Sequence, residues 1–336
     1  MIDLRSSTVP SDSALLRLLG INAGLAAVTV ADELGVFSTL RRGERNARAL
    51  AVELQLDEHG VDVLCRTLVV EQVLAVGATG FVLSEFGATY WTAESPLYWA
   101  PVLEYRRAEK PHIRLRDVLR TGAGINAITE LWQSGNVDRE TAVGFTRIMH
   151  SIALPPAIMA ARSGAFDGVE HLLDVGGGSG AGCAAFVSYY PISTATLLDL
   201  PPVCAVGMDY VARYVPEGRV RALPHDFFRT PLPTGADAHL FANVLHDWPM
   251  DRVRFLLEQS FAALPAGGRL FVQEMLLGED RMTPSNAVYL DLMMFINHGS
   301  QQFTFSQLSE LICDVGFAPP TLVSRFGDHS LLMARR

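Results

Sequence analysis

The chain has 336 residues, of which 49% are hydrophobic, and this composition is typical of a globular protein with room for two domains. Its formal net charge of −9 disfavours nucleic-acid binding. The sequence contains no apolar run of about 18 residues, so no membrane span is predicted. The four cysteines are scattered and no secretory signal is visible, so we expect a cytoplasmic protein without a metal site or a disulfide framework.

The first 105 residues read as helices with one short hairpin. Residues 15–30 are apolar nearly all round, so a helix there must be buried inside a core or against a second subunit. Two further helices are predicted over residues 47–54 and around residues 61–69, whose apolar side chains share one face. Residues 77–83 resemble the small wing of a winged helix, a fold that often binds DNA. The net acidity and the apolar first helix favour a dimerisation role for this domain.

Residues 106–165 are predicted to form connecting helices. Phe145 and Met149 lie at helical spacing ahead of Pro155 and Pro156, which should stop or bend the helix. Core packing would explain these two apolar residues. Because ligand pockets favour domain junctions, a role in lining a pocket between domains is the alternative.

From His171 onward, strands alternate with helices, a pattern typical of a parallel, doubly wound α/β sheet. Residues 320–325 and 329–334 read instead as a C-terminal antiparallel hairpin. Such a hairpin beside a parallel sheet distinguishes methyltransferases from dehydrogenases. The expected parallel strands are residues 171–175, 194–200, 219–223, 238–245 and 269–275.

The turn after the first of these strands is rich in glycine and runs into a predicted helix. Backbone N–H groups at a helix N-terminus can bind a nucleotide-like ligand, and glycine lets that ligand approach the backbone. Gly176, Gly178 and Ala181 satisfy the loose dinucleotide pattern. Asp174 and the close Gly-x-Gly-x-Gly spacing favour S-adenosylmethionine, whose amino-acid end bears an ammonium group, over a nicotinamide dinucleotide.

Acidic residues also mark the ends of the next two strands. Asp199 ends the second strand, where a carboxylate can accept hydrogen bonds from both hydroxyls of a ribose. An acid that only caps the following helix is the alternative. Asp226 and Phe227 follow the third strand, and they could offer a carboxylate to the adenine amino group and a ring to its face.

The fourth strand ends in Val-Leu-His-Asp-Trp, which places His246 at the sheet edge where ligands of open α/β folds bind. A neutral imidazole with a pKa of about 6.5 can take a proton from a bound phenol near neutral pH. Glu274 ends the neighbouring fifth strand, and its carboxylate could keep one ring nitrogen protonated and aim the other at a substrate. A purely structural histidine is the alternative.

Together these motifs resemble the small-molecule O-methyltransferases of the plant caffeic-acid and bacterial natural-product type, from about residue 15 to the C-terminus. The motifs that occur in the family's order are Leu-Asp-Val-Gly-Gly-Gly-Ser-Gly, Leu-Asp-Leu-Pro, His-Asp-Phe-Phe, Leu-His-Asp-Trp and Pro-Ala-Gly-Gly-Arg-Leu-Phe-Val-Gln-Glu. The resemblance implies a homodimer with a class I, Rossmann-like sheet that binds S-adenosylmethionine, preceded by a winged-helix-like dimerisation domain.

The resemblance also implies roles for individual residues, with His246 as the base and Glu274 as its orienting acid. The residues expected to bind the cofactor are Asp174, Gly176, Gly178, Asp199, Leu200, Asp226, Phe227 and Trp248. The residues expected to line the acceptor pocket are Phe145, Met149, Met293, Met294, Asn297, His298 and Gln302.

The chain departs from the family pattern in two places. Where many relatives carry Gly-Gly-x-Glu-Arg-Thr, Gln302 and Phe303 replace the acid and the arginine. An amide can hydrogen-bond an imidazole but cannot stabilise its cation by charge, so we expect a less basic His246 or an already acidic acceptor. Ala242 stands where plant members place a lysine near adenine. His298 adds either a second imidazole near the acceptor or a loop histidine in water.

We therefore predict an S-adenosylmethionine-dependent methyltransferase of bacterial secondary metabolism, acting on a small aromatic metabolite at a phenolic oxygen, with no nucleic-acid or membrane partner. The predicted domains are residues 1–105 for dimerisation, 106–165 for connecting helices that contribute to the acceptor pocket, and 166–336 for catalysis. Carbon or nitrogen methylation on the same scaffold is the nearest alternative, because fold does not fix the reaction. A ligand-sensing winged-helix regulator and a nicotinamide oxidoreductase are further alternatives.

Overall fold

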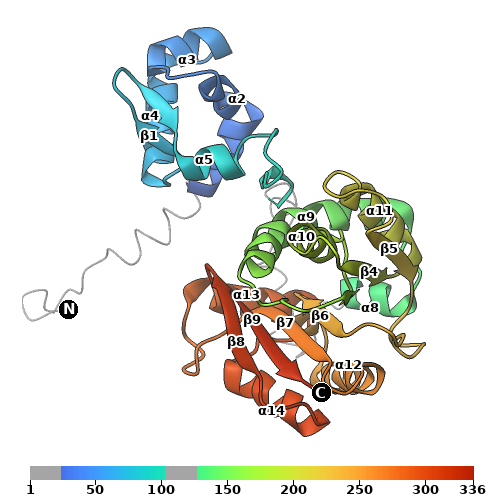
Figure 1. The fold of residues 1–336 in the computed structure, drawn as a ribbon. Coiled ribbons are helices and arrows are strands. Elements are labelled where there is room, and N and C mark those ends of the chain that lie inside the picture. Colours follow the sequence, from blue (N-terminus) through green and yellow to red (C-terminus); the bar gives the residue numbers. More distant parts are fainter. Residues whose placement is uncertain (1–23, 103–126) are drawn as a thin grey trace, which may run out of the picture. The chain divides into compact units, whose positions relative to one another are not determined.

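The computed structural model describes residues 24–102 and 127–336, and the chain divides into two compact units, Met1–Glu104 and Tyr105–Arg336 (Figure 1). The rest of the chain lies outside the described residues, including most of the predicted helix over residues 15–30. Within the described ranges, no helix combines the length and apolar character needed to cross a membrane.

The first unit consists of short helices and one antiparallel hairpin. Its elements are a helix over residues 24–33, α2 (Val36–Arg41), α3 (Ala47–Leu54), α4 (Glu58–Val70), β1 (Leu74–Val76), β2 (Phe81–Leu83) and α5 (Glu85–Tyr90). The side chains of Asn46 and Asp57 accept hydrogen bonds from the first turns of α3 and α4, which explains where these helices begin. Val61, Cys65 and Leu68 are the buried face of α4, as their spacing predicts.

The apolar helix over residues 24–33 is not buried on every side in a single copy of the chain. Val28 and Ala31 are buried, but Leu25 is 45% exposed and Val30 is 41% exposed. Burial inside the unit's own core is therefore wrong for part of this helix. Burial against a second subunit stays a prediction, as does the winged-helix character of the hairpin.

The second unit is built on a seven-stranded sheet with the strand order β5-β4-β3-β6-β7-β9-β8. Its strands are β3 (His171–Val175), β4 (Thr194–Asp199), β5 (Val220–Pro224), β6 (Ala238–Ala242), β7 (Arg269–Met275), β8 (Thr321–Phe326) and β9 (His329–Arg335). Strands β3 to β7 pair in parallel, whereas β9 pairs antiparallel with β7 and with β8. This arrangement confirms the predicted doubly wound sheet with a C-terminal hairpin.

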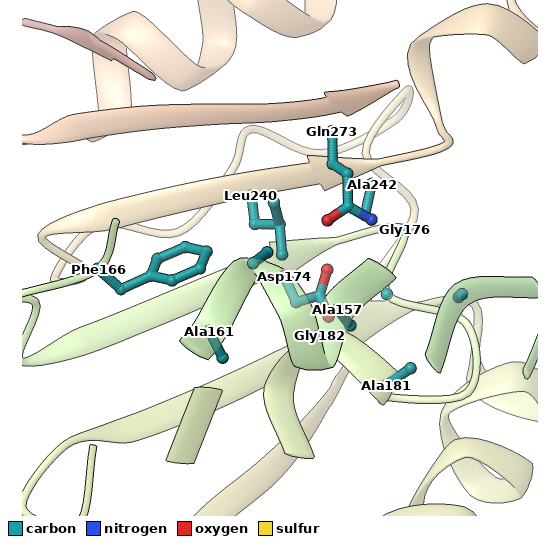
Figure 2. Close-up of a pocket in the computed structure, with 13 residues that line it drawn as sticks. Ala157, Ala161, Phe166, Asp174, Gly176, Ala181, Gly182, Leu240, Ala242 and Gln273 are labelled. Carbon is teal, nitrogen blue, oxygen red and sulfur yellow. The ribbon is translucent and has the colours of Figure 1, made fainter. Parts of the chain in front are cut away.

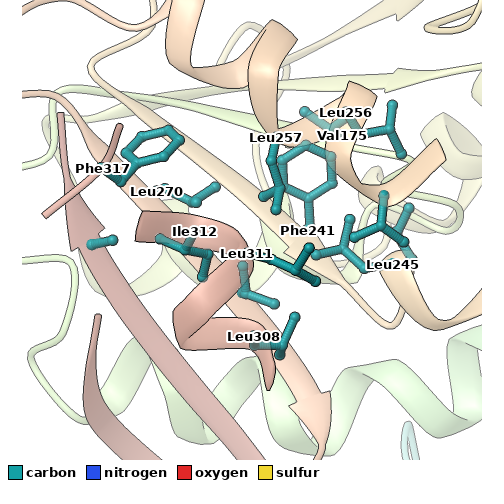
Figure 3. Close-up of a cluster of buried hydrophobic side chains, with 14 of the residues drawn as sticks. Val175, Phe241, Leu245, Leu256, Leu257, Leu270, Leu308, Leu311, Ile312 and Phe317 are labelled. Carbon is teal, nitrogen blue, oxygen red and sulfur yellow. The ribbon is translucent and has the colours of Figure 1, made fainter. Parts of the chain in front are cut away.

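Helices cover both faces of this sheet (Figure 1). The helices of the second unit are α8 (Ala127–Ser134), α9 (Arg139–Arg162), α10 (Ala181–Tyr189), α11 (Pro201–Val211), α12 (Met250–Ala263), α13 (Ser285–His298) and α14 (Phe305–Val315). On one face, Phe186 of α10 and Ala160 of α9 pack against Leu197 of β4. On the other face, residues of α12 and α14 surround Phe241 of β6 (Figure 3). The runs of buried residues in the central strands follow from this double cover.

Pro155 and Pro156 lie inside α9 and do not end it, so the expected stop is wrong, whereas the expected bend stays a prediction. Each proline lacks a backbone N–H and so removes one hydrogen bond of the helix. The turn after the prolines buries Ala157 and Ala160, and α9 packs along α10. Burial of this turn offsets the lost hydrogen bonds, so the helix continues past the prolines.

The fourth parallel strand is shorter than predicted. β6 ends at Ala242, Asn243 has a left-handed φ of 52°, and a 3-10 turn over Leu245–Asp247 (η1) follows. The apolar run continues beyond the strand because Leu245 is a core residue of the turn. His246 therefore sits on a tight turn just past the carboxyl end of β6.

Candidate active site

The glycine turn between β3 and α10 has a backbone that favours glycine. Gly176, Gly178 and Gly180 have φ angles of 70°, 54° and 70°. A Cβ on Gly176 would also lie 3.0 Å from a methyl group of Val244 and 3.7 Å from the ring of Phe227. The turn thus lies close against the segments that follow β5 and β6.

Asp199, at the end of β4, fixes one side of this turn. Its Oδ2 accepts a hydrogen bond of 2.9 Å from Gly178 N, and its Oδ1 accepts one of 2.7 Å from Leu200 N. Burial raises the pKa of the Asp199 carboxyl to about 6, although both backbone hydrogen bonds act to lower it. Each carboxylate oxygen has a second lone pair, so the group can also accept hydrogen bonds from ligand hydroxyls.

A small cavity, lined mostly by apolar side chains, lies beside the turn. Its volume of about 30 Å³ is enough to hold a water molecule. Figure 2 shows the side chains of Asp174 and Gln273, two of the residues that line the cavity, directed toward one another. Asp174 is wholly buried, and burial raises its pKa to about 7. In the described part of the chain, no group partners the buried Nε2 of Gln273, so a carboxyl and an unpaired amide donor share the cavity.

Aromatic side chains form a wall on the other side of the turn. The rings of Phe227 and Trp248 are perpendicular, with centroids 6.1 Å apart. Trp248 is 4% exposed, and its indole N–H has no hydrogen-bond partner among the described residues. Asp226 accepts a hydrogen bond from Phe228 N and lies 3.3 Å from the guanidinium of Arg229. The wall and this carboxylate could together hold a flat, nitrogen-bearing ring.

The structure brings His246 and Glu274 together, although 28 residues separate them in the chain. Nδ1 of His246 lies 2.9 Å from Oε2 of Glu274, whose side chain is fully buried. The backbone N–H of His246 also donates to Oε1 of Glu274 over 3.4 Å. The pairing arises because β6 and β7 are neighbours and both residues lie at their carboxyl ends.

The electrostatic surroundings of His246 differ from the expectation of an ordinary or weakened base. Burial alone would lower the pKa of the imidazole. The negative charges of Glu274 and Asp247 outweigh burial and raise the pKa of His246 to about 9. The imidazole of the free enzyme is therefore protonated at neutral pH.

Gln302 approaches the same ring nitrogen as Glu274. Its Nε2 lies 2.8 Å from Nδ1 of His246, and its side chain is fully buried. The two contacts need opposite states of Nδ1, because a carboxylate accepts a proton from this nitrogen whereas an amide N–H donates to it. The orientation of the Gln302 amide is thus linked to the tautomer of His246.

Two further residues at the base were not singled out from the sequence. Oδ1 of Asp247 lies 3.5 Å from Nε2 of His246 and 3.8 Å from Nε2 of His298, so it stands between two imidazoles. The hydroxyl of Ser300 donates to the backbone carbonyl of His246. Asp247 lies within the Leu-His-Asp-Trp motif, which could have signalled it, whereas nothing local marks Ser300.

The residues predicted to line the acceptor pocket come from two helices, except Gln302, which follows the second of them. Phe145 and Met149 are half-buried on α9, and the Phe145 ring lies 4.7 Å from that of Trp132 on α8. Helix α13 contacts both α8 and the 3-10 turn that carries His246. On α13, Met293 is half-buried, whereas Met294 and Asn297 are buried. Trp132 was not predicted from the sequence; its ring contacts Phe145, and its helix α8 contacts α13.

Comparison with known proteins gives a consistent result. Residues 115–318 match the O-methyltransferase domain family. The chain is 26% identical to the 3-hydroxy-5-methyl-1-naphthoate 3-O-methyltransferase of Streptomyces sahachiroi, over 93% of this chain and 92% of the relative. It is 30% identical to the mitomycin biosynthesis 6-O-methyltransferase of Streptomyces lavendulae, over 85% and 83% of the two chains. The crystal structure of human N-acetylserotonin methyltransferase in complex with SAM matches with a TM-score of 0.83 at 25% identity, covering 98% of this chain and 99% of that one.

Proposed function

Because the chain belongs to the family of S-adenosylmethionine-dependent O-methyltransferases, we propose that it methylates a hydroxyl of a small aromatic metabolite in bacterial secondary metabolism. The observation that carries this proposal is the pairing of His246 with Glu274. The pair lies at the carboxyl ends of the parallel strands, where the glycine turn also lies. The Streptomyces relatives are named for O-methylation of a hydroxynaphthoate and for mitomycin biosynthesis, which supports an oxygen acceptor on an aromatic compound.

The residues around the glycine turn fit S-adenosylmethionine. Asp199 has lone pairs left for ribose hydroxyls, and Asp226 with Phe227 and Trp248 suits the adenine ring. Asp174 is a buried carboxyl, and the ammonium group of the cofactor would stabilise its ionised form if placed beside it. When bound, S-adenosylmethionine supplies an electrophilic methyl group on its sulfonium.

His246 removes the proton of the acceptor hydroxyl through Nε2. This role requires the proton of the neutral ring to sit on Nδ1, and the carboxylate of Glu274, whose Oε2 lies 2.9 Å away, would accept that N–H. The same carboxylate stabilises the imidazolium that forms. Since the pKa of His246 is raised, its neutral form is abundant only at alkaline pH. The remaining task of the protein is to hold the acceptor oxygen in line with the methyl group.

The test is incubation of the purified enzyme with methyl-labelled S-adenosylmethionine and a panel of hydroxynaphthoates, hydroxyquinones and aminophenols, with NMR assignment of each product. We expect the label on a phenolic oxygen. Added S-adenosylhomocysteine, the expected coproduct, should suppress labelling and serves as the control. A label found on ring carbon or nitrogen would contradict the oxygen acceptor and leave the methyltransferase assignment standing.

The acceptor pocket is proposed to use the side chains of two helices. Phe145 and Met149 of α9 would contribute apolar surface beside Trp132. Helix α13 supports the proposal because it contacts the turn of the base, and its Met293, Met294, Asn297 and His298 would face the acceptor with Gln302. An aromatic acceptor suits such a pocket, since ring faces pack well on methionine and aromatic side chains.

We further propose a cytoplasmic homodimer that forms through the first unit. The support is the apolar helix over residues 24–33, where Leu25 and Val30 are 45% and 41% exposed. Apolar side chains that stay exposed on one copy favour association with a second copy. Light scattering should report a dimer at micromolar concentration, and a soluble monomer would contradict the proposal.

A further inference from the structure

His150 is a buried histidine near the middle of α9 that takes no part in the proposed chemistry. Its Nδ1 lies 2.9 Å from the hydroxyl oxygen of Ser179, and its Nε2 lies 2.9 Å from the hydroxyl oxygen of Tyr214. The ring also packs on Tyr210, with centroids 4.3 Å apart. Because His150 is only 5% exposed, these side chains form its immediate surroundings.

The imidazole of His150 is neutral in these surroundings. Burial, assisted by the positive charge of Arg213, lowers its pKa to about 4. A neutral imidazole has one donor and one acceptor nitrogen, and each hydroxyl can either donate or accept. The ring can therefore satisfy both partners without a buried charge, and it keeps the same protonation state throughout the neutral range.

Three segments around the cofactor crevice meet at this ring. Ser179 lies in the glycine turn and is 3% exposed. Tyr210 belongs to α11, which starts two residues after Asp199, and Tyr214 follows that helix. His150 itself belongs to α9. We propose that His150 is a positioning residue that holds the glycine turn in its binding conformation by fastening it to α9 and α11.

The benefit of this bond lies in the free enzyme. A turn with several glycines has many accessible backbone conformations. The apparent affinity for a ligand is the intrinsic affinity multiplied by the fraction of molecules whose turn is in the binding conformation. Without the imidazole, the hydroxyl of Ser179 would be buried without this partner, which favours local opening. His150 also fastens the turn to the helix that carries Phe145 and Met149, so ordering of the turn extends to the proposed acceptor side.

This inference rests on cofactor binding as proposed above, and its test measures binding directly. His150→Phe keeps a ring on Tyr210 but removes both hydrogen bonds. We expect calorimetry to show about tenfold weaker binding of S-adenosylhomocysteine. This loss corresponds to a turn that adopts its binding conformation in about a tenth of the free molecules. The KM for S-adenosylmethionine should rise by a similar factor while kcat changes by less than about twofold. Hydrogen exchange of the peptide over residues 176–183 should be faster in the free variant.

Two other variants separate positioning from simple stability. His150→Gln retains a donor and an acceptor and should recover part of the affinity, whereas Tyr214→Phe removes one bond and should give an intermediate loss. His239→Phe is the matched control, because His239 is also fully buried and bonded to a hydroxyl, that of Ser260 on α12. This control should lower the melting temperature and leave the affinity unchanged.

The inference would be overturned by wild-type affinity and wild-type exchange in His150→Phe. It would equally fail if His239→Phe weakened binding as much, since the effect would then reflect general stability. If His150→Phe does not fold, Tyr214→Phe carries the test with the same readouts. Failure of the wild-type enzyme to bind S-adenosylhomocysteine would instead contradict the proposed function.

Discussion

The proposed site has a cofactor end at the glycine turn and a base end at His246, and these two ends are held in different ways. At the cofactor end, Asp199 accepts hydrogen bonds from the backbone of Gly178 and Leu200, so main-chain geometry sets the position of the carboxylate. At the base end, His246 is surrounded by side chains from separate segments, among them Glu274 and Gln302. The difference predicts that substitutions at the first end change affinity, whereas those at the second change the rate and its pH dependence.

The buried histidines show the same contrast in their charge state. Carboxylates raise the pKa of His246, whereas burial lowers the pKa of His150 and of His239, each of which is bonded to a hydroxyl. Burial is common to all three residues. The nature of the neighbouring group decides whether the imidazole can serve as a charged partner in catalysis or only as a neutral structural link.

His246→Ala should produce the largest effect of any substitution at the two ends of the proposed site. Removal of the base should lower kcat by about 10²–10⁴-fold, while the affinity for S-adenosylhomocysteine stays unchanged. Steady-state kinetics and calorimetry on the same preparation measure the two quantities. Loss of cofactor affinity would make His246 a structural residue. Full retained activity would instead indicate an acceptor that is already ionised.

Asp199→Ala should change the affinity for the cofactor and not the rate. A lost hydrogen bond to a charged group costs about 1.5–3 kcal/mol, so the cofactor should bind roughly 10–150-fold more weakly. At saturating cofactor, kcat should stay close to that of the wild type. Asp209→Ala, an exposed acid of α11, is the matched control and should bind normally. Normal calorimetric affinity in Asp199→Ala would remove this residue from the site.

Glu274→Gln should reduce the rate less than His246→Ala, because the carboxylate orients the base and does not accept the substrate proton. The change also removes the charge that raises the pKa of His246. The wild-type rate should rise with pH as the imidazole loses its proton and level off above its pKa. In the variant this rise should move to lower pH, and an unshifted pH–rate profile would show that Glu274 does not set the basicity.

Gln302→Glu should give the smallest effect and the opposite shift. A second carboxylate beside Nδ1 favours the imidazolium, so the rise in rate should move to higher pH with little loss at the alkaline plateau. Gln301→Glu adds the same charge one residue earlier, where the side chain is half-buried, and serves as the control. Equal shifts in the two variants would mean that the contact between Gln302 and the base has no particular influence.

Much of the cofactor end could be predicted from the sequence because its geometry is local. A tight turn at the end of a buried strand favours glycine. The position of Asp199 at the end of an apolar strand is enough to single it out as a candidate. The pairing of His246 with Glu274 could also be predicted, since His246 follows β6 and Glu274 lies near the end of the neighbouring parallel strand β7.

The remaining features depend on packing between distant segments. The continuation of α9 through Pro155 and Pro156 depends on burial against α10. Local helix propensity does not predict this packing. The contact of His150 with Ser179 joins residues 29 positions apart through the placement of a whole helix. The raised pKa of His246 likewise comes from the carboxylates that the fold places beside the ring. The amide of Gln302, which takes the place of an acid in the family pattern, does not prevent this rise in pKa.

The C-terminal hairpin has a consequence for the behaviour of the enzyme at high concentration. Because β9 and β8 lie beyond β7, the strand of Glu274 is interior, and the exposed edge of the sheet on this side is β8. Pairing of β8 with β9 shifts register between Leu322 and Ser324, so its backbone is irregular. An irregular edge strand is a poor template for a strand of another molecule, and the hairpin thereby protects this side of the sheet from edge-to-edge aggregation.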